Sequence, residues 1–354
     1  MRIAIVASPF ISIPPVRYGG TELFVATLAE ALVAKRIDVA VYANGESTVN
    51  AELRWRYPQS DWPLAHESAG MTKELDQVAW AIEDAARDCD IVHVNSAISV
   101  TYSRFSEAAT VCTLHHPFDP AFADLYARYP NVFYVAISNG QASHYPRLDV
   151  ETIHHGIDLN QYSFQPHKED YLCFLGRIAP LKGVHQAIEV AKKAGIPLKI
   201  AGEVQPVFRD YFETQIKPHI DNRFIEYIGE ADLAMKNELF GRSMGFLFPI
   251  EWEEPFGLVM VEAMACGTPV YAFARGAVPE VICEGVSGSM CNSVVQMAEK
   301  VRTMKFNPKR VRQWVAEKFS AEVMAGRYLD LYRRILQEEG DEDEAWPEAG
   351  EIAV

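Results

Sequence analysis

Two glutamates, Glu254 and Glu262, flank an almost wholly apolar run in the stretch EPFGLVMVEAMACGTPV. Pro255 and Gly257 mark a turn, the run after them has helical character, and its Gly-Thr-Pro ending stops a helix. Glu254 then precedes the helix and Glu262 stands in its second turn, roughly 12 Å away if the whole stretch is helical. A glycosidase acid and base lie roughly 5–10 Å apart, so this spacing disfavours a hydrolase pair. It favours a ligand held at two points, with a phosphate at the helix N-terminus between them.

A simpler interpretation is that Glu254 stabilises the helix dipole while Glu262 meets water. If the carboxylates bind a ligand instead, we expect only the far face of the helix to be buried, because burying an unpartnered charge is costly. The residues alone leave both interpretations open. Glu251 and Glu253, in the same stretch, are interpreted as ordinary solvated acids.

Two cations, Arg177 and Lys182, lie just after a predicted strand in FLGRIAPLKG. Fixed cations can stabilise a diphosphate that gains negative charge as a bond to it breaks, although the simpler interpretation is that these two are surface cations after a strand. Gly19 and Gly20 lie between the first predicted strand and the first predicted helix. Glycines there allow the backbone to approach a phosphate closely, and the alternative is a flexible turn.

Two histidines, His115 and His116, end another predicted strand. A strand histidine is more often structural than catalytic. However, ligands of parallel sheets bind at the carboxyl ends of strands, which is where this pair lies.

Strand and helix patterns alternate along the chain, as in parallel sheets with helices on both faces. The alternation restarts after a polar stretch at 165–170, which is the best linker candidate. The sequence therefore predicts an α/β fold with two doubly wound domains and a cleft between them. Thr21 is expected to cap the first helix, a further helix is expected over 73–87, and 44–71 is expected to be irregular. The predicted strands cover 2–7, 38–43, 91–95, 110–116 and 133–138, then 171–177, 197–203, 224–229, 245–250 and 269–274.

The composition is that of a globular protein, and 354 residues favour two domains over one core. A net charge of −15 disfavours nucleic acid and an anionic membrane as partners. The six cysteines form no CxxC pair and are expected to be buried, reduced thiols, not zinc ligands. The first residues are interpreted as a strand and not as a signal peptide, and no run is long enough to span a membrane, which favours the cytoplasm.

Six motifs in chain order resemble the retaining nucleotide-sugar glycosyltransferases of family 4, which have the GT-B fold of two Rossmann-like domains facing across a cleft. They are PPVRYGGTE, TLHH, VAIS, IHHGID, FLGRIAPLKG and GAVPEVI, and the E-x7-E pattern of EPFGLVMVE precedes the last of them. The resemblance covers nearly the whole chain.

The resemblance implies roles for the residues singled out above. Glu262 should accept hydrogen bonds from the ribose and Glu254 from hydroxyls of the donor sugar, since carboxylates are strong acceptors. Arg177 and Lys182 should face the diphosphate, and His115 could bond the donor sugar. Further donor contacts are implied for Gly19, Gly20, the backbone of Ile228, and the N–H groups of Phe256, Gly257 and Leu258.

Three positions remain unassigned or open. His116 has no assigned role, and His155 stands where the family frequently has asparagine, which puts that contact in doubt. Glu280 lies near the donor in many relatives, but it is equally well interpreted as a helix-start carboxylate.

We therefore expect an acceptor-binding domain over 1–165, a donor-binding domain over 166–319, a helix near 320–338 that crosses back to the first domain, and an acidic tail over 339–354. The expected reaction is retaining transfer of a hexose from a nucleotide diphosphate sugar, with a UDP-sugar favoured. Neither a cofactor nor a metal is expected. Two alternatives are a nucleotide-sugar 2-epimerase and a non-catalytic nucleotide-sugar-binding module.

The acceptor is less well defined by the sequence than the donor. It could be a sugar, another small molecule or a glycolipid. The first 170 residues contain more acids than bases, so at most a loose, peripheral membrane contact through Trp55, Trp62 and their neighbours is expected.

Overall fold

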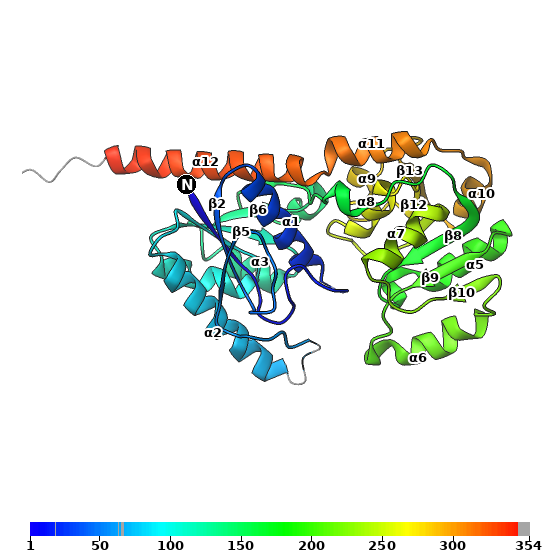
Figure 1. The fold of residues 1–354 in the computed structure, drawn as a ribbon, viewed down its shortest axis with the longest axis horizontal. Helices are drawn as coiled ribbons and strands as arrows, with labels where there is room; N and C mark the ends of the chain where they lie inside the picture. Colours follow the sequence, from blue (N-terminus) through cyan, green and yellow to red (C-terminus); the bar gives the residue numbers. More distant parts are fainter. Residues whose placement is uncertain (18, 63, 65–66, 346–354) are drawn as a thin grey trace, which may run out of the picture.

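The computed structural model describes residues 1–17, 19–62, 64 and 67–345, with 67 and 339–345 as backbone only. It contains two parallel sheets that follow one another along the chain, and the domains they form lie side by side (Figure 1). The first sheet has the order β3-β2-β1-β4-β5-β6-β7. Its strands are β1 (Arg2–Val6), β2 (Asp38–Ala43), β3 (Glu52–Trp55), β4 (Ile91–Val94), β5 (Ala109–Leu114), β6 (Phe133–Ala136) and β7 (Val150–Thr152).

The second sheet has the order β10-β9-β8-β11-β12-β13, and all its pairings are parallel. Its strands are β8 (Glu169–Leu175), β9 (Leu198–Ala201), β10 (Ile225–Tyr227), β11 (Ser243–Phe248), β12 (Val270–Phe273) and β13 (Gly288–Cys291). In both sheets, the strand order reverses beside the first strand of the domain. This reversal is the switch point at which doubly wound sheets bind ligands.

Both faces of each sheet are buried, which explains why the strands are nearly continuous apolar runs. In β1, Ile3 and Ile5 face one core while Ala4 and Val6 face the other, following the two-residue period of a strand. Helices cover all four faces. In the first domain, they include α1 (Gly20–Ala34), α2 (Glu67–Ala85), η1 (Ala97–Phe105), α3 (Pro120–Tyr126) and α4 (Asn139–Ala142).

The helical segments that follow β7 belong mostly to the second domain. The longer ones are α5 (Val184–Ala194), α7 (Leu233–Arg242), α8 (Leu258–Ala265), α10 (Val294–Thr303) and α11 (Pro308–Lys318). The shorter ones are η2 (Leu159–Gln161), η3 (Pro180–Lys182), η4 (Pro206–Phe208), α6 (Arg209–Tyr211), η5 (Phe212–Ile216), η6 (Lys217–His219) and α9 (Val278–Val281).

The last helix, α12 (Ala321–Ala345), returns to the first domain and packs against α1 (Figure 1). Its Tyr328 and Tyr332 are fully buried in the core of that domain. His93 on β4 bonds the Tyr332 hydroxyl at 2.7 Å, and Thr113 on β5 lies 2.9 Å from the Tyr328 hydroxyl. The helix continues to Ala345, well into the stretch expected to be an acidic tail, and 346–354 lie outside the described residues.

Three expectations about secondary structure were wrong. The stretch expected to be irregular contains β3, which pairs with β2 although only two of its four residues are apolar. Arg54 on this edge strand bonds Glu52, Asp84 and Asp88, so ion pairs stabilise the strand where a continuous apolar run is lacking. The second helix begins at residue 67, before the expected start, and the first begins at Gly20, one residue before the expected cap.

Candidate active site

A cavity of about 600 Å³ lies between the two domains. Ten of the eleven residues expected to bind the donor line it, and Ile228 is not among the lining residues. Ile228 instead packs against the apolar core beneath α8. The ten are Gly19, Gly20, His115, Arg177, Lys182, Glu254, Phe256, Gly257, Leu258 and Glu262.

Helix α8 points its N-terminus into this cavity. Gly257 precedes the helix with φ of 82°, a backbone conformation that side chains other than glycine rarely adopt. No acceptor among the described residues takes the N–H groups of Phe256, Gly257 or Leu258. These free donors and the helix dipole make the start of α8 a site for an anion.

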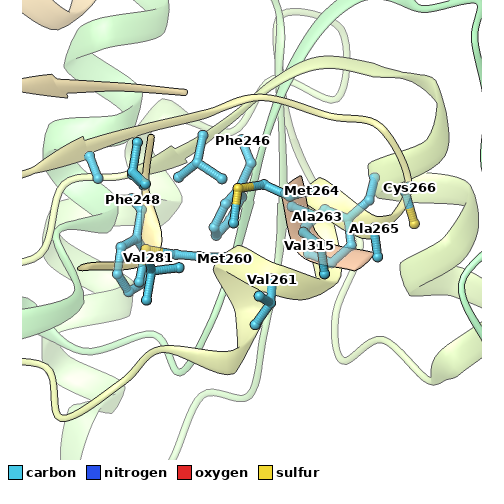
Figure 2. Close-up of a cluster of buried hydrophobic side chains, with 14 of the residues drawn as sticks. Phe246, Phe248, Met260, Val261, Ala263, Met264, Ala265, Cys266, Val281 and Val315 are labelled. Atoms are coloured by element: carbon cyan, nitrogen blue, oxygen red, sulfur yellow. The ribbon is translucent and has the colours of Figure 1, made fainter. Parts of the chain in front are cut away.

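The body of α8 is buried on all sides, and not only on its far face as expected. Every residue from Met260 to Ala265 is buried. Figure 2 shows the apolar ones among these side chains packed against Phe246 and Phe248 of β11 and, from other elements, against Val281 and Val315. The helix is sandwiched between the sheet and α11, which a single helical segment cannot reveal.

Glu262 is 2% exposed, so the interpretation that it meets water was wrong. Its Oε1 accepts hydrogen bonds from the Tyr162 hydroxyl at 2.8 Å and from Lys236 Nζ at 3.0 Å, and its Oε2 lies 3.3 Å from the same Nζ. Burial, reinforced by the carboxylate, raises the pKa of Tyr162 well above its ordinary value, so this phenol stays a donor. A ligand hydroxyl that reaches Glu262 must therefore share the carboxylate with Lys236 or replace it.

Glu254 is paired with the cation that was expected to face a diphosphate. Its Oε2 accepts hydrogen bonds from Lys182 Nζ at 2.6 Å and from Trp252 Nε1 at 2.9 Å. The ammonium of Lys182 also lies 4.6 Å from the centre of the Trp252 ring, in cation–π geometry. Arg177, by contrast, has no carboxylate partner among the described residues. It is therefore the cation of this cavity that is free to meet an anionic ligand.

His115 is held as a neutral acceptor. The Asn95 amide donates to Val6 O, so its Oδ1 faces His115 Nε2 at 2.9 Å and fixes the ring proton there. Burial, reinforced by neighbouring His155, lowers the pKa of His115 well below its ordinary value. The Nδ1 lone pair of His115 can then accept a hydrogen bond from a hydroxyl.

His155 stacks on His115 with ring centres 5.2 Å apart, and it lines the same cavity. Burial lowers the pKa of His155 to about 3, so it too is neutral. His116 points elsewhere, because its Nε2 lies 2.6 Å from the Tyr126 hydroxyl and its Nδ1 bonds the Pro117 carbonyl. That environment favours a structural role for His116.

Comparisons with known proteins identify the family and the fold. Residues 18–161 match the family model described as Glycosyltransferase Family 4, and residues 158–319 match Glycosyl transferases group 1. The chain belongs to the family-4 glycosyltransferases. Its fold is GT-B, as in the avilamycin glycosyltransferase AviGT4, with a TM-score of 0.73 at 24% identity over 95% of this chain and 98% of that one. Anabaena HepE, solved with UDP and glucose, gives a TM-score of 0.72 at 18% identity over 93% and 98%.

Curated relatives of this family member differ in how much of their length they share with it. The N-acetyl-alpha-D-glucosaminyl L-malate synthase of Bacillus anthracis is 24% identical over 338 residues, covering 83% of this chain and 84% of the relative. The glycogen synthase of Mycobacterium tuberculosis (strain ATCC 25618 / H37Rv) is 28% identical over 202 residues, covering 52% of this chain. The chain spans about half the length of that glycogen synthase, 48%.

The two glycines of the N-terminal loop are not equivalent in this family member. Gly19 has φ of 145°, and a Cβ there would lie 2.8 Å from both Pro15 and Glu22. Gly20 has no neighbour within 4 Å of the same position. Gly19 is therefore required by the backbone, whereas Gly20 presents an open surface at the cavity.

Glu280 does not line the cavity, and it is more than a helix-start carboxylate. From α9 in the second domain, it accepts hydrogen bonds from the N–H groups of Asn139 and Gly140 at 2.8 and 2.7 Å. It also accepts from His154 Nε2 at 2.8 Å. Although burial opposes ionisation, these partners in the first domain lower the pKa of Glu280 below its ordinary value. Glu280 thus joins the two domains beside the cavity.

Sequence reasoning missed Tyr162, Lys236 and Trp252, which fix the two glutamates. Lys236 lies in a polar helical stretch with no motif to distinguish it, and Tyr162 is 100 residues from its partner Glu262. Only the Trp252-Glu-Glu254 spacing could have drawn attention to one of them, since residues two apart can meet in a turn.

The structure also bears on the expectations about cysteines, metal binding and membrane contact. All six cysteines are free, and five of them are buried. In the described part of the chain, no group of three or more His, Cys, Asp or Glu side chains is placed to hold a metal ion. No helix there is long and apolar enough to cross a membrane. Trp55 and Trp62 are 50% and 46% exposed.

Proposed function

We propose that this protein transfers a hexose from a nucleotide diphosphate sugar to an acceptor hydroxyl, with retention of anomeric configuration. The observation that carries this proposal is the start of α8, where three free N–H groups lie between Glu254 and Glu262 in one cavity. A ligand with an anionic centre and hydroxyl groups at both ends fits that order. A nucleotide diphosphate sugar has this order, with ribose, diphosphate and hexose in sequence.

In this proposal, the three parts of the donor occupy successive positions along the cavity. The ribose hydroxyls approach Glu262, beside Lys236 and Tyr162. The diphosphate lies at the N–H groups of α8 with Arg177, and the hexose lies between Glu254 and His115. We favour a UDP-sugar, because solved structures of the same fold hold UDP and UDP-glucose.

The chemistry follows from these positions. The acceptor oxygen attacks the anomeric carbon as the bond from that carbon to the diphosphate oxygen breaks. The acceptor proton leaves with the nucleoside diphosphate, so no protein base is required. Negative charge grows on the diphosphate during this step, and preorganised donors stabilise it. Arg177 and the start of α8 supply that positive charge, so we infer that the reaction requires no metal.

The first test is a melting-temperature screen against UDP, GDP and ADP, because a ligand bound only by the folded state raises stability. The corresponding nucleotide sugars are then incubated with the protein, and proton NMR identifies the anomer released first by slow hydrolysis. Retention with release of nucleoside diphosphate supports the proposal. Epimerisation at C2 supports an epimerase, and stabilisation without turnover supports a non-catalytic binding module.

Arg177→Gln gives the residue-level test. Loss of one preorganised charge should reduce turnover about 100-fold. Arg147→Gln is the matched control, because its side chain is 81% exposed and does not line the cavity. Equal turnover in the two variants would contradict the placement of the diphosphate.

A further inference from the structure

A second, smaller cavity of about 230 Å³ lies next to the first, and Glu254 lines both. It shares Pro117, Trp252, Glu254 and Pro255 with the first cavity, so the two cavities are neighbours. Its remaining lining residues are Phe118, Gly140, Gln141, His144, Glu253 and Gly276. Both domains contribute, since the segment after β5 and α4 face the loops before α8 and α9.

The two cavities differ in charge. In the first cavity, four carboxylates, from Glu203, Glu230, Glu254 and Glu262, are balanced by four cations: Arg17, Arg177, Lys182 and Lys236. Neither lysine nor arginine lines the second, which has the carboxylates of Glu253 and Glu254. A phosphate or carboxylate group would be repelled there, because like charges at close range disfavour binding.

Each of these carboxylates keeps one oxygen for a ligand. Glu253 Oε2 accepts from Gly276 N at 2.6 Å, and Glu254 Oε2 accepts from Lys182 and Trp252. Among the described residues, no donor reaches Oε1 of either glutamate. Free carboxylate oxygens in a cavity are strong acceptors for hydroxyl groups.

An aromatic surface complements these acceptors. Phe118 is 40% exposed, although its ring is held in place by His144, stacked with ring centres 5.4 Å apart, and by Tyr145 edge-on. Such a rigid ring can cover the apolar face of a sugar ring while the hydroxyl groups turn towards the glutamates.

The walls of the second cavity are fixed before any ligand arrives. Gln141 Nε2 donates to the carbonyl groups of Leu114 and His116, which anchors the segment that carries Phe118. Glu280 binds the N–H group of Gly140 and so holds the two sides of the cavity together. A preformed site loses less entropy on binding.

We propose that the second cavity is the acceptor subsite and that it takes an uncharged sugar ring. This inference rests on the proposed function, because it places the acceptor beside the donor hexose at Glu254. The sugar hydroxyl that attacks the anomeric carbon faces the first cavity, and the rest of the ring lies between Phe118 and Glu253. The proton of that hydroxyl leaves with the nucleoside diphosphate, as above.

The test measures UDP release from UDP-glucose, or nucleoside diphosphate release from the donor that the nucleotide screen selects. Methyl α-glucoside and maltose are the neutral probes, and glucose 6-phosphate is the charged one. The neutral sugars should accelerate release with saturation, and glucose 6-phosphate should not. Phe118→Ala should raise the acceptor KM about tenfold, the factor that corresponds to losing one aromatic contact, with the donor KM unchanged.

Phe105→Ala is the matched control, because Phe105 is 74% exposed and lines neither cavity. Glu253→Lys should weaken the neutral sugars and let glucose 6-phosphate bind. A higher donor KM in Phe118→Ala with the acceptor KM unchanged would overturn the proposal. So would acceleration by glucose 6-phosphate alone, or donor hydrolysis that no neutral probe accelerates. Absence of both nucleotide binding and donor turnover would instead refute the proposed function.

Discussion

Lys236→Met tests whether Glu262 depends on the cation that the sequence did not reveal. Glu262 has a side chain 3% exposed, and Lys236, 19% exposed, lies 3.0 and 3.3 Å from its two oxygens. Methionine keeps the unbranched shape and most of the length of the side chain, and it removes the charged ammonium donor. Breaking one side of a buried ion pair costs about 3–5 kcal/mol, because the remaining charge loses its partner. Tyr162 still donates to Glu262, so we expect the lower end, ~3 kcal/mol.

Urea and thermal unfolding, followed by tryptophan fluorescence, measure this loss. Lys236 and Glu262 both belong to the second domain. If the two domains unfold in separate transitions, only the transition of the second domain should shift. For a domain of this size, 1 kcal/mol corresponds to roughly 2–4 °C, which predicts a fall of roughly 6–12 °C in Tm.

Lys193→Met is the matched control, because Lys193 pairs with Glu189 at 3.5 Å and both side chains are about half exposed. An exposed pair of this kind contributes at most about 1 kcal/mol. Adding Glu262→Gln to Lys236→Met should restore much of the stability, since no unpaired charge then remains. The reasoning is refuted if Lys236→Met costs no more than Lys193→Met, or if the double variant is no more stable than the single one.

Three further predictions concern the cavity and the domain interface. Burial depresses the pKa of His155 to about 3, so its contribution to the free energy of unfolding is complete above pH ~6.5 and falls by ~1.4 kcal/mol per pH unit below that. His155→Asn should therefore reduce the dependence of Tm on pH in thermal melts between pH 7 and 5. Glu280→Ala should lower the free energy of unfolding by about 2–3 kcal/mol at neutral pH, and this loss should shrink on acidification. The reason is the lowered pKa of Glu280: its stabilisation is present above about pH 4.3 and disappears as the carboxylate is protonated. Gly19→Ala should cost about 1–3 kcal/mol in urea unfolding through strain at its positive φ, whereas Gly20→Ala should leave stability unchanged; equal costs would contradict the roles assigned to these glycines.

Much of the fold could be predicted from the sequence, because the apolar runs of both sheets are buried on two faces. Such runs stand out without any knowledge of their neighbours. The edge strand β3 was missed for the opposite reason. The strand has no continuous apolar run, and the partners of Arg54 that stabilise it come from the end of α2 and the residues after it.

For the residues around the cavity, too, some properties could be predicted from the sequence and others could not. The sequence by itself determined the parts whose chemistry is local: the glycines, the turn before α8, and the residue types of Glu254, Glu262, Arg177 and Lys182. Burial and pairing were decided only by the tertiary structure. Lys236 and Tyr162 reach Glu262 from other segments, and Lys182 turns to Glu254, because the free energy of a charge depends on which groups packing brings within hydrogen-bonding distance.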